Sequence, residues 1–545
     1  MDGVICTGYR ERVRGRNGAL VALVATIPWS GLAAQGAARP AARTEVYAGS
    51  ELETYLRTLQ VAGVIGPYPW SARRFTAVEV DRLLPADSAH PWAARYDWRP
   101  ASTRGVSVAL ARPEVASRFN SSFPYGYNDG AVWGGRGITL SAQGGLSVRY
   151  GPLAAALVPL VAWTSNGRFR LQPNGQTGTL QYQDGRYPGS IDRPQRFGPD
   201  AYAVASGGQT VFEVSKWGLA TGVSSANDYW GPASDFPVIL GNNASGFPHV
   251  FAGTAVPLDL WIARIHVRTL FGRLTQTAYA PQAGDTAIRG ATGAVLVLTP
   301  RWPGGLEFGA TRFVHRIWAR RESVLDELYS PFRFSTARND PLENQLVSVF
   351  FRWVVPRGGV EIYGEYGSDD SRYDLREIFV EPDHIAGYTI GLRHVARRPS
   401  GWLRVIRAEV QNLQPGTLVQ SRGQGPFYIH SPLGQGHTYR GQILGSEWGV
   451  GGAAAKVAVD WYHPGGRRTV SWSRLLRGDT GDTVATAPQN PRGLDVLHAL
   501  GVEALFFRGR YDVWAGATAV YELNRDFRRD AFNLNLSVGA RASLR

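Results

Sequence analysis

The sequence predicts an all-β barrel that spans the outer membrane with about 18 antiparallel strands and carries a small N-terminal helical bundle on the periplasmic side. Composition is the first observation: the 545 residues include 65 glycines and 17 tryptophans, 23 tyrosines and 22 phenylalanines. Hydropathy is the second, because a mean of −0.19 with charges spread throughout excludes a polytopic helical membrane protein. The third is a hydrophobic period of two from about residue 104 onward.

This alternation is clearest at the C-terminus. Apolar residues from Phe532 to Leu544 alternate without error with polar or small residues such as Asn533, Asn535 and Ser537. Residues 347–355 and 456–462 show the same pattern. Because successive side chains of a strand point to opposite faces, each segment is predicted to be a strand with one apolar face.

Turn signals separate these segments in two sizes. Short ones are rich in glycine and proline and lie at residues 303–305, 356–359, 398–401, 464–466 and 508–510. Longer polar connections cover residues 320–344, 368–385, 412–445 and 478–493. Short turns on one side and long loops on the other are typical of an outer-membrane barrel, and the segments amount to roughly 16 to 18 strands. A soluble sandwich or propeller is the alternative, since it shows the same alternation.

The N-terminus has the order of a secretory signal. Arg10, Arg12, Arg14 and Arg16 precede an apolar run over residues 19–28, and small residues follow it. We therefore predict a signal peptide over residues 1–35 that is cleaved between Gly31 and Gly36. An anchor helix is the alternative, although the run is short for a span. The single cysteine, Cys6, would leave with the signal, so neither a disulfide nor a thiolate metal site is expected.

Residues 36–100 are predicted to form a linker and a periplasmic helical bundle, and residues 101–545 the barrel. Ser50 and Glu53 form a capping-box pattern before apolar residues at spacings of three and four, which predicts a helix over 51–62. Thr76 and Glu79 repeat the pattern before a second helix that ends at Pro85. A third helix is expected near Pro91.

The charge is basic and almost entirely arginine. The net charge is +14, and removal of residues 1–40 takes away five arginines and two acids, which leaves +11. Lysine occurs only at positions 216 and 456. Scattered arginine suits a pore wall, an acidic polysaccharide or the phosphates of lipopolysaccharide, whereas an exported chain has little access to nucleic acid.

Several blocks resemble the capsule assembly Wzi family. The most specific is Asn227-Asp228-Tyr229-Trp230-Gly231-Pro232, followed by residues 237–244 and by Phe247-Pro248. Residues 56–60 with the helix near 79–84, residues 343–345, residues 363–370 and residues 430–445 extend the similarity over most of the mature chain.

This resemblance implies a lectin-like barrel in the outer membrane that attaches exported capsular polysaccharide to the cell surface without catalysis. The polysaccharide is expected to be acidic, outer-membrane lipids and lipopolysaccharide are further expected partners, and a monomer is expected. The candidate polysaccharide-binding residues come from the similar blocks: Asp228, Tyr229, Trp230, Asn242, Asn243, Asp369, Asp370, His437, Tyr439 and Arg440. Aromatic rings stack on sugars and amides pair with hydroxyls, but the same residues also suit a structural plug in the lumen.

Other chemistries have little support in the sequence. It contains no Gly-x-Ser-x-Gly elbow, no His-Glu-x-x-His helix and no Gly-Lys-Ser/Thr loop, so no catalytic residue and no cofactor are predicted. Acidic residues near one long connection favour a solvated loop over a divalent-cation site, and no metal ligand is assigned: Glu361, Glu365, Asp374, Glu377 and Glu381. A porin is the main alternative function, and a hydrolase with acids converging at the outer rim is a second.

Overall fold

The computed structural model describes residues 45–96, 98, 105–282, 284–333, 343–369, 375–416, 424–477 and 494–542. The predicted signal peptide, its cleavage site and the linker up to residue 43 lie outside these ranges. None of the described helices combines the length and apolar character that a membrane span requires.

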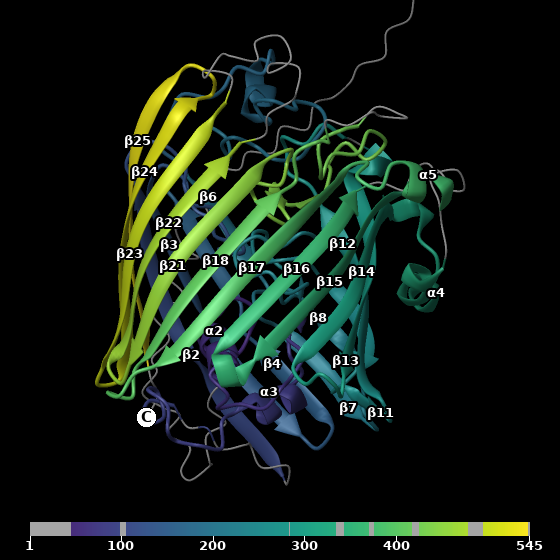
Figure 1. Ribbon diagram of the computed structural model, residues 1–545. Coiled ribbons are helices and arrows are strands. Elements are labelled where there is room, and N and C mark those ends of the chain that lie inside the picture. The colour runs from purple at the N-terminus through teal and green to yellow at the C-terminus, as the bar shows by residue number, and fades with distance from the viewer. Residues whose placement is uncertain are drawn as a thin grey trace, which may run out of the picture. The chain divides into compact units, whose positions relative to one another are not determined.

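The strands form one closed antiparallel barrel (Figure 1). Its uninterrupted strands are β2 (Val106–Asn120), β3 (Gly137–Tyr150), β8 (Leu219–Ser224), β12 (Ala263–Thr275), β13 (Ile288–Pro300), β14 (Leu306–Ile317), β15 (Asn344–Val355), β16 (Val360–Asp369), β17 (Ala386–Arg397), β18 (Leu403–Asn412), β21 (Ala453–His463), β22 (Gly466–Leu476), β23 (Val496–Arg508), β24 (Tyr511–Arg525) and β25 (Arg529–Ala542).

Three further strands that cross the barrel wall are each interrupted once, and we call each complete crossing a stave. Their halves are β4 (Leu153–Leu157) and β5 (Leu160–Thr164), β6 (Tyr202–Ser206) and β7 (Val211–Lys216), and β10 (His249–Thr254) and β11 (Leu258–Leu260). The 21 strand segments therefore make 18 staves, which confirms the predicted number. The first strand, β2, pairs with both β3 and β25 and so closes the barrel.

The outer face of the barrel is apolar, as the alternation predicted. On β15, Val347, Val349 and Phe351 point outward and are 41, 54 and 40 % exposed, whereas Ser348 and Arg352 point inward and are buried. Tryptophans mark one edge of this apolar band, because Trp217, Trp261 and Trp302 in the short turns are 86, 91 and 87 % exposed. An apolar band with an aromatic girdle is the outer surface of a barrel that lies in a membrane.

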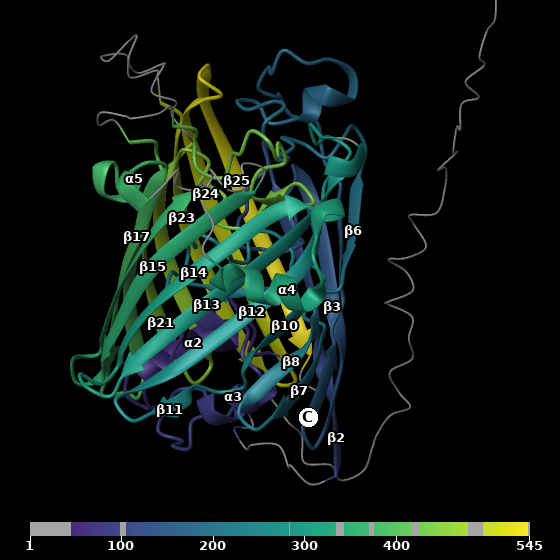
Figure 2. The same cartoon turned by 90° about the vertical axis from the view of Figure 1, so that its right-hand side faces the viewer.

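The two ends of the barrel differ in their connections. All five predicted short turns lie at one end, together with the helices α2 (Glu51–Val61) and α3 (Ala77–Leu83), and the long loops gather at the other end (Figures 1 and 2). Two other short helices, α4 (Val324–Tyr329) and α5 (Leu375–Val380), belong to long loops. Since short turns of such barrels face the periplasm, we expect the long loops to face outside.

The N-terminal segment packs on the inner wall at the short-turn end. The apolar face of α2 predicted from the sequence is fully buried, and it joins a core with Val354, Val405, Tyr462 and Leu505 of the barrel. The capping box of α3 at Thr76 is complete. The third helix expected near Pro91 is wrong, because residues 91–95 form turns that place Trp92 in a ring stack 4.0 Å from Tyr55.

This topology predicts which side of the membrane each connection faces. An epitope tag inserted after Gln424, in a long loop, should be labelled by antibody on intact cells. A tag at Gly465, in the short turn between β21 and β22, should be labelled only after the outer membrane is permeabilised. The opposite pattern would contradict the orientation.

Candidate functional site

The Trp-Gly-Pro block of the sequence lies inside the barrel. Residues Tyr229 and Trp230 form the short strand β9 (Tyr229–Trp230), which pairs with β1 (Ala72–Arg73) of the N-terminal segment. The Trp230 ring is 1 % exposed and meets the ring of Phe313 edge-on at 6.3 Å. The guanidinium of Arg73 lies 3.5 Å from the centroid of the Tyr229 ring. Both rings are therefore buried, and the block, called the plug below, fills part of the barrel interior.

Buried charges hold the residues that follow the block. The carboxylate of Glu409 on β18 accepts hydrogen bonds from the backbone N–H groups of Ser234, Asp235 and Phe236. The carboxylate of Asp235 accepts hydrogen bonds from Lys456 at 2.5 Å and Arg407 at 2.9 Å. Burial alone would raise the pKa of Asp235, but these two cations lower it overall. The plug is thus tied to the inner wall by paired charges.

Most of the other sequence candidates also lie in this interior. Asp228 is paired with Arg74 and His249, Asn242 donates to the carbonyl of Ala48, and Asp369 accepts from the N–H of Tyr428. All three residues are less than a tenth exposed. Asp370 lies outside the described residues.

The candidates around His437 belong to a buried hairpin of β19 (Thr438–Tyr439) and β20 (Gln442–Ile443). The ring of His437 is fully buried and is hydrogen-bonded to His315 at 2.8 Å and to the carbonyl of Ile239 at 2.7 Å. Burial lowers the pKa of His437 to about 3, so the ring is neutral at physiological pH. Tyr439 is 7 % exposed, and Arg440 donates to the carbonyl of Ala205.

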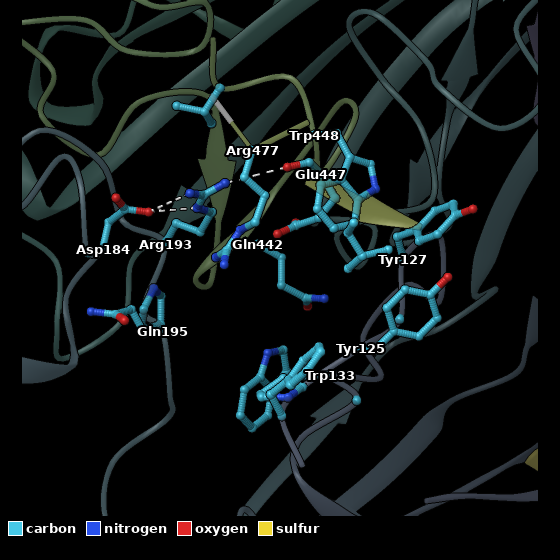
Figure 3. A pocket seen from close by; sticks show the side chains of 18 of the residues that line it. Tyr125, Tyr127, Trp133, Asp184, Arg193, Gln195, Gln442, Glu447, Trp448 and Arg477 are labelled. Carbon is cyan, nitrogen blue, oxygen red and sulfur yellow. Dashed lines mark hydrogen bonds and ion pairs between the residues drawn. The ribbon is translucent and has the colours of Figure 1, made fainter. Parts of the chain in front are cut away.

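A pocket of about 140 Å³ opens among the long loops at the opposite end from α2 (Figure 3). Its residues come from the loops at 121–136, 165–201, 225–248, 413–452 and 477–495 and from the adjoining ends of β23 and β24. Aromatic side chains supply much of the lining: Phe123, Tyr125, Tyr127, Trp133, Phe169, Tyr187 and Trp448. Since several of these rings are partly exposed, they offer flat apolar faces to a ligand.

Polar side chains surround these rings. Asp184 accepts hydrogen bonds from Arg193 at 2.8 Å and from the N–H groups of Arg186 and Tyr187, each at 2.8 Å. Burial alone would raise the pKa of Asp184, but Arg193 and the two N–H groups lower it overall. Amides complete the lining: Gln172, Gln195, Asn243 and Gln442. The pocket combines ring faces, amides and fixed charges.

The charges of the pocket nearly cancel. Arg186, Arg193, Arg477 and Arg525 line it, and so do Asp129, Asp184, Glu447, Asp495 and Glu522. Arg477 and Arg525 lie 3.3 and 2.6 Å from the carboxylate of Glu522. The arginine excess of the whole chain is therefore not concentrated in this pocket.

Sequence reasoning missed most of this pocket. Of the nine candidates that the structure describes, only Asn243 lines it, while Tyr229 and Asn242 line a second, polar cavity of about 420 Å³. Asn243 donates to Glu447 at 3.0 Å, which joins two of the lining loops. The available signal was the aromatic run Phe123-Pro124-Tyr125-Gly126-Tyr127 in a loop between two strands.

The acidic residues considered for a cation divide into two groups. Glu361 and Glu365 point into the barrel, away from the loop. Glu377, Glu381 and His384 lie together within 4.8 Å and are buried, so the solvated loop expected from the sequence is wrong here. The carboxylate of Glu381 lies 3.2 Å from the ring of His384 and accepts a hydrogen bond from Gln424 at 3.0 Å, so it is engaged within the protein. These three residues could hold a divalent cation; Asp374 lies outside the described residues.

Comparisons with solved structures agree with this architecture. The chain is similar to Wzi from Escherichia coli, described as an outer membrane protein involved in group 1 capsule assembly and as a carbohydrate binding β-barrel. The TM-score is 0.62 at 14 % identity, over 92 % of this chain and 99 % of that chain.

Similarity to two further barrels is lower. They are OccAB2 from Acinetobacter baumannii, with a TM-score of 0.37 at 8 % identity, and a BenF-like porin from Pseudomonas fluorescens Pf-5, with 0.40 at 9 %. Each match covers 80 % of this chain and 98 % of the other.

Comparison of the sequence with curated proteins gives no match. The family described as capsule assembly protein Wzi matches residues 208–507, which is more than half of the sequence. This range contains the Trp-Gly-Pro block, eleven complete barrel staves (β8, β10 with β11, β12 to β18, β21 and β22) and three of the five loops that line the pocket. The chain belongs to the capsule assembly protein Wzi family.

Proposed function

We propose that this outer-membrane barrel binds capsular or other exported polysaccharide at the cell surface, through the pocket among its long loops. The observation that carries the proposal is the lining itself, in which Trp133, Tyr125, Tyr127 and Trp448 line the same pocket as Gln195 and Gln442 (Figure 3). The apolar face of a sugar ring stacks on an aromatic ring, and amide groups donate to and accept from its hydroxyls.

Binding without catalysis suits the state of two of the pocket carboxylates. Asp184 is held by Arg193 and two backbone N–H groups, and Glu522 by Arg477 and Arg525. Carboxylates fixed in ion pairs stabilise the positions of loops and are poorly placed to transfer protons.

The acidity of the polymer is a separate part of the proposal. The pocket charges nearly cancel, so a preference for an acidic polymer would come from its surroundings. Arg168 and Arg170 are exposed on both sides of Phe169, which lines the pocket. Binding of an acidic polymer should therefore weaken as salt increases, because exposed charges are screened.

Titration of purified barrels with polysaccharide from the same strain tests the pocket. Replacing both Trp133 and Trp448 by alanine should weaken binding by about 10-fold or more, since two stacking faces are lost and each factor of ten corresponds to about 1.4 kcal/mol. Trp472→Ala is the matched control, because Trp472 is 41 % exposed on the outer face of β22. Unchanged affinity of the double variant would contradict the assignment of this pocket.

A further inference from the structure

A loop of the barrel descends along its outer wall. Residues 318–333 form a strap made of the turn Trp318–Arg320, the helix α4 and the turn Ser330–Phe332. Both views of the barrel place α4 outside the wall, well below the long loops (Figures 1 and 2). The strap packs on β12, β13 and β14. It therefore lies where the other staves present their apolar face to lipid.

Polar groups of the wall hold the strap in this place. Side chains alternate between the two faces along a strand. Arg268 of β12 and Arg289 of β13 point inward, because they contact interior residues. Thr269 and Thr292 lie an odd number of positions away on the same strands and therefore point outward. Thr269 donates to the carbonyl of Leu328 at 2.6 Å, and Thr292 donates to that of Glu327.

Two outward arginines of β14 make the same kind of contact. Arg312 donates to the carbonyl of Pro331 at 3.2 Å, and Arg316 pairs with the fully buried carboxylate of Glu327 at 3.2 Å. Arginines without a polar partner on a lipid-facing wall would lower the stability of the barrel. The strap supplies their partners and is thus a fixed part of the outer surface.

The free side of the strap carries four exposed apolar side chains next to an ion-paired group, in which Arg333 contacts Glu322 and Asp326. Leu325 is 78 % exposed, Tyr329 59 %, Phe332 50 % and Val324 49 %. On the side toward the long loops, the ring of Trp318 stacks on Phe271 with centroids 5.6 Å apart. This surface has the composition of a protein face in contact with acyl chains, with a tryptophan near the membrane–water boundary.

Three exposed arginines surround this tryptophan. The guanidinium groups of Arg321 and Arg273 lie 4.7 and 5.8 Å from the ring centroid of Trp318, and Arg320 adjoins it in sequence. Within the part of the chain that the structure describes, no carboxylate forms an ion pair with any of the three. They form a positive cluster beside the apolar residues of the strap, whose exposed carboxylates, Glu322 and Asp326, pair with Arg333 instead.

We propose that the strap surface, made of Val324, Leu325, Tyr329 and Phe332 with Arg273, Arg320 and Arg321, binds a phosphate-bearing glycolipid of the outer leaflet. The acyl chains lie along the apolar residues, and the phosphates pair with the arginines, whose planar guanidinium groups match phosphate geometry. The site is separate from the polysaccharide pocket and does not depend on it.

Binding of purified full-length protein in detergent to two lipids tests this proposal. The probes are lipid A with both phosphates and the same lipid without phosphates, measured by native mass spectrometry. The unaltered chain should prefer the phosphorylated lipid by about 10-fold or more. This comparison uses only the unaltered protein, so its result does not depend on whether a variant folds. Absence of a preference would overturn the proposal.

Variants then locate the site. Arg320→Gln with Arg321→Gln should remove the preference, and lysine at both positions should retain most of it. Leu325→Asn with Phe332→Asn should weaken binding of both lipids. Arg508→Gln with Arg510→Gln is the matched control, because these arginines are exposed at the short-turn end.

Two outcomes would overturn the site. An equal loss in the control pair would show diffuse attraction to positive charge instead of a site at the strap. Displacement of lipid A by millimolar inorganic phosphate would show a simple anion site in place of a glycolipid site. Retained heat-modifiable mobility on gels verifies that each variant is folded.

Discussion

Replacing Glu361 by glutamine should destabilise the barrel by about 3–5 kcal/mol, which is typical when one partner of a buried ion pair is removed. The Glu361 carboxylate on β16 is fully buried, and it accepts hydrogen bonds from Arg57 at 2.9 Å and from Arg352. Arg393 lies 3.5 Å from it. Glutamine would leave these three cations buried without their shared counter-charge.

The variant should also loosen the plug, because Arg57 of α2 donates both to Glu361 and to the carbonyl of Pro232 in the Trp-Gly-Pro block. Denaturant unfolding in micelles measures the stability, and planar bilayers measure conductance, which should rise. Asp259→Asn is the control, since its pair with Arg301 is exposed and should contribute less than about 1 kcal/mol. Equal stability of the two variants would show that Glu361 does not anchor the plug.

Replacing Trp230 by alanine should cost about 3–5 kcal/mol as well, here through an unfilled cavity. The ring is fully buried, and a Cβ at Gly293 would lie only 2.8 Å from it, so the wall is already shaped around the indole. The neighbouring residues are backbone-paired with β1 and have little freedom to collapse into the space.

This variant separates the two roles considered for the Trp-Gly-Pro block. If the block is an interior plug, folded Trp230→Ala barrels should bind polysaccharide nearly as well as the unaltered protein, while their midpoint of unfolding falls and their conductance rises. If Trp230 is a sugar platform, binding is lost and stability is kept. Titration and unfolding of one preparation distinguish these results, with Trp472→Ala as the control for loss of an indole.

The strands were predictable because their signal is local. An alternation such as that of residues 347–355 fixes which side chains face outward, and glycine-rich turns such as 464–466 fix where the chain reverses. The two helices α2 and α3 were found for the same reason, since capping residues and apolar spacing lie within one segment. The turns at residues 91–95 were mistaken for a helix because their conformation depends on the stacking of Trp92 against Tyr55.

The pocket was not predictable because its geometry is not local. Trp133 and Trp448 come from loops more than 300 residues apart in sequence, and no period relates them. The Trp-Gly-Pro block was visible as consecutive residues, yet its burial depends on Arg73 and Phe313, which no motif connects to it. Local patterns therefore identified the family blocks, and only the folded loops identified the open ring faces.

The ratio of cell-bound to released polysaccharide tests the central claim most directly. A deletion strain should make normal total polymer but release most of it, and the unaltered gene should restore the bound fraction. The gene with Trp133→Ala and Trp448→Ala should produce the same amount of barrel in the outer membrane and leave the polymer in the released fraction. If this double variant restores the bound fraction fully, the pocket is not the site that retains the polysaccharide.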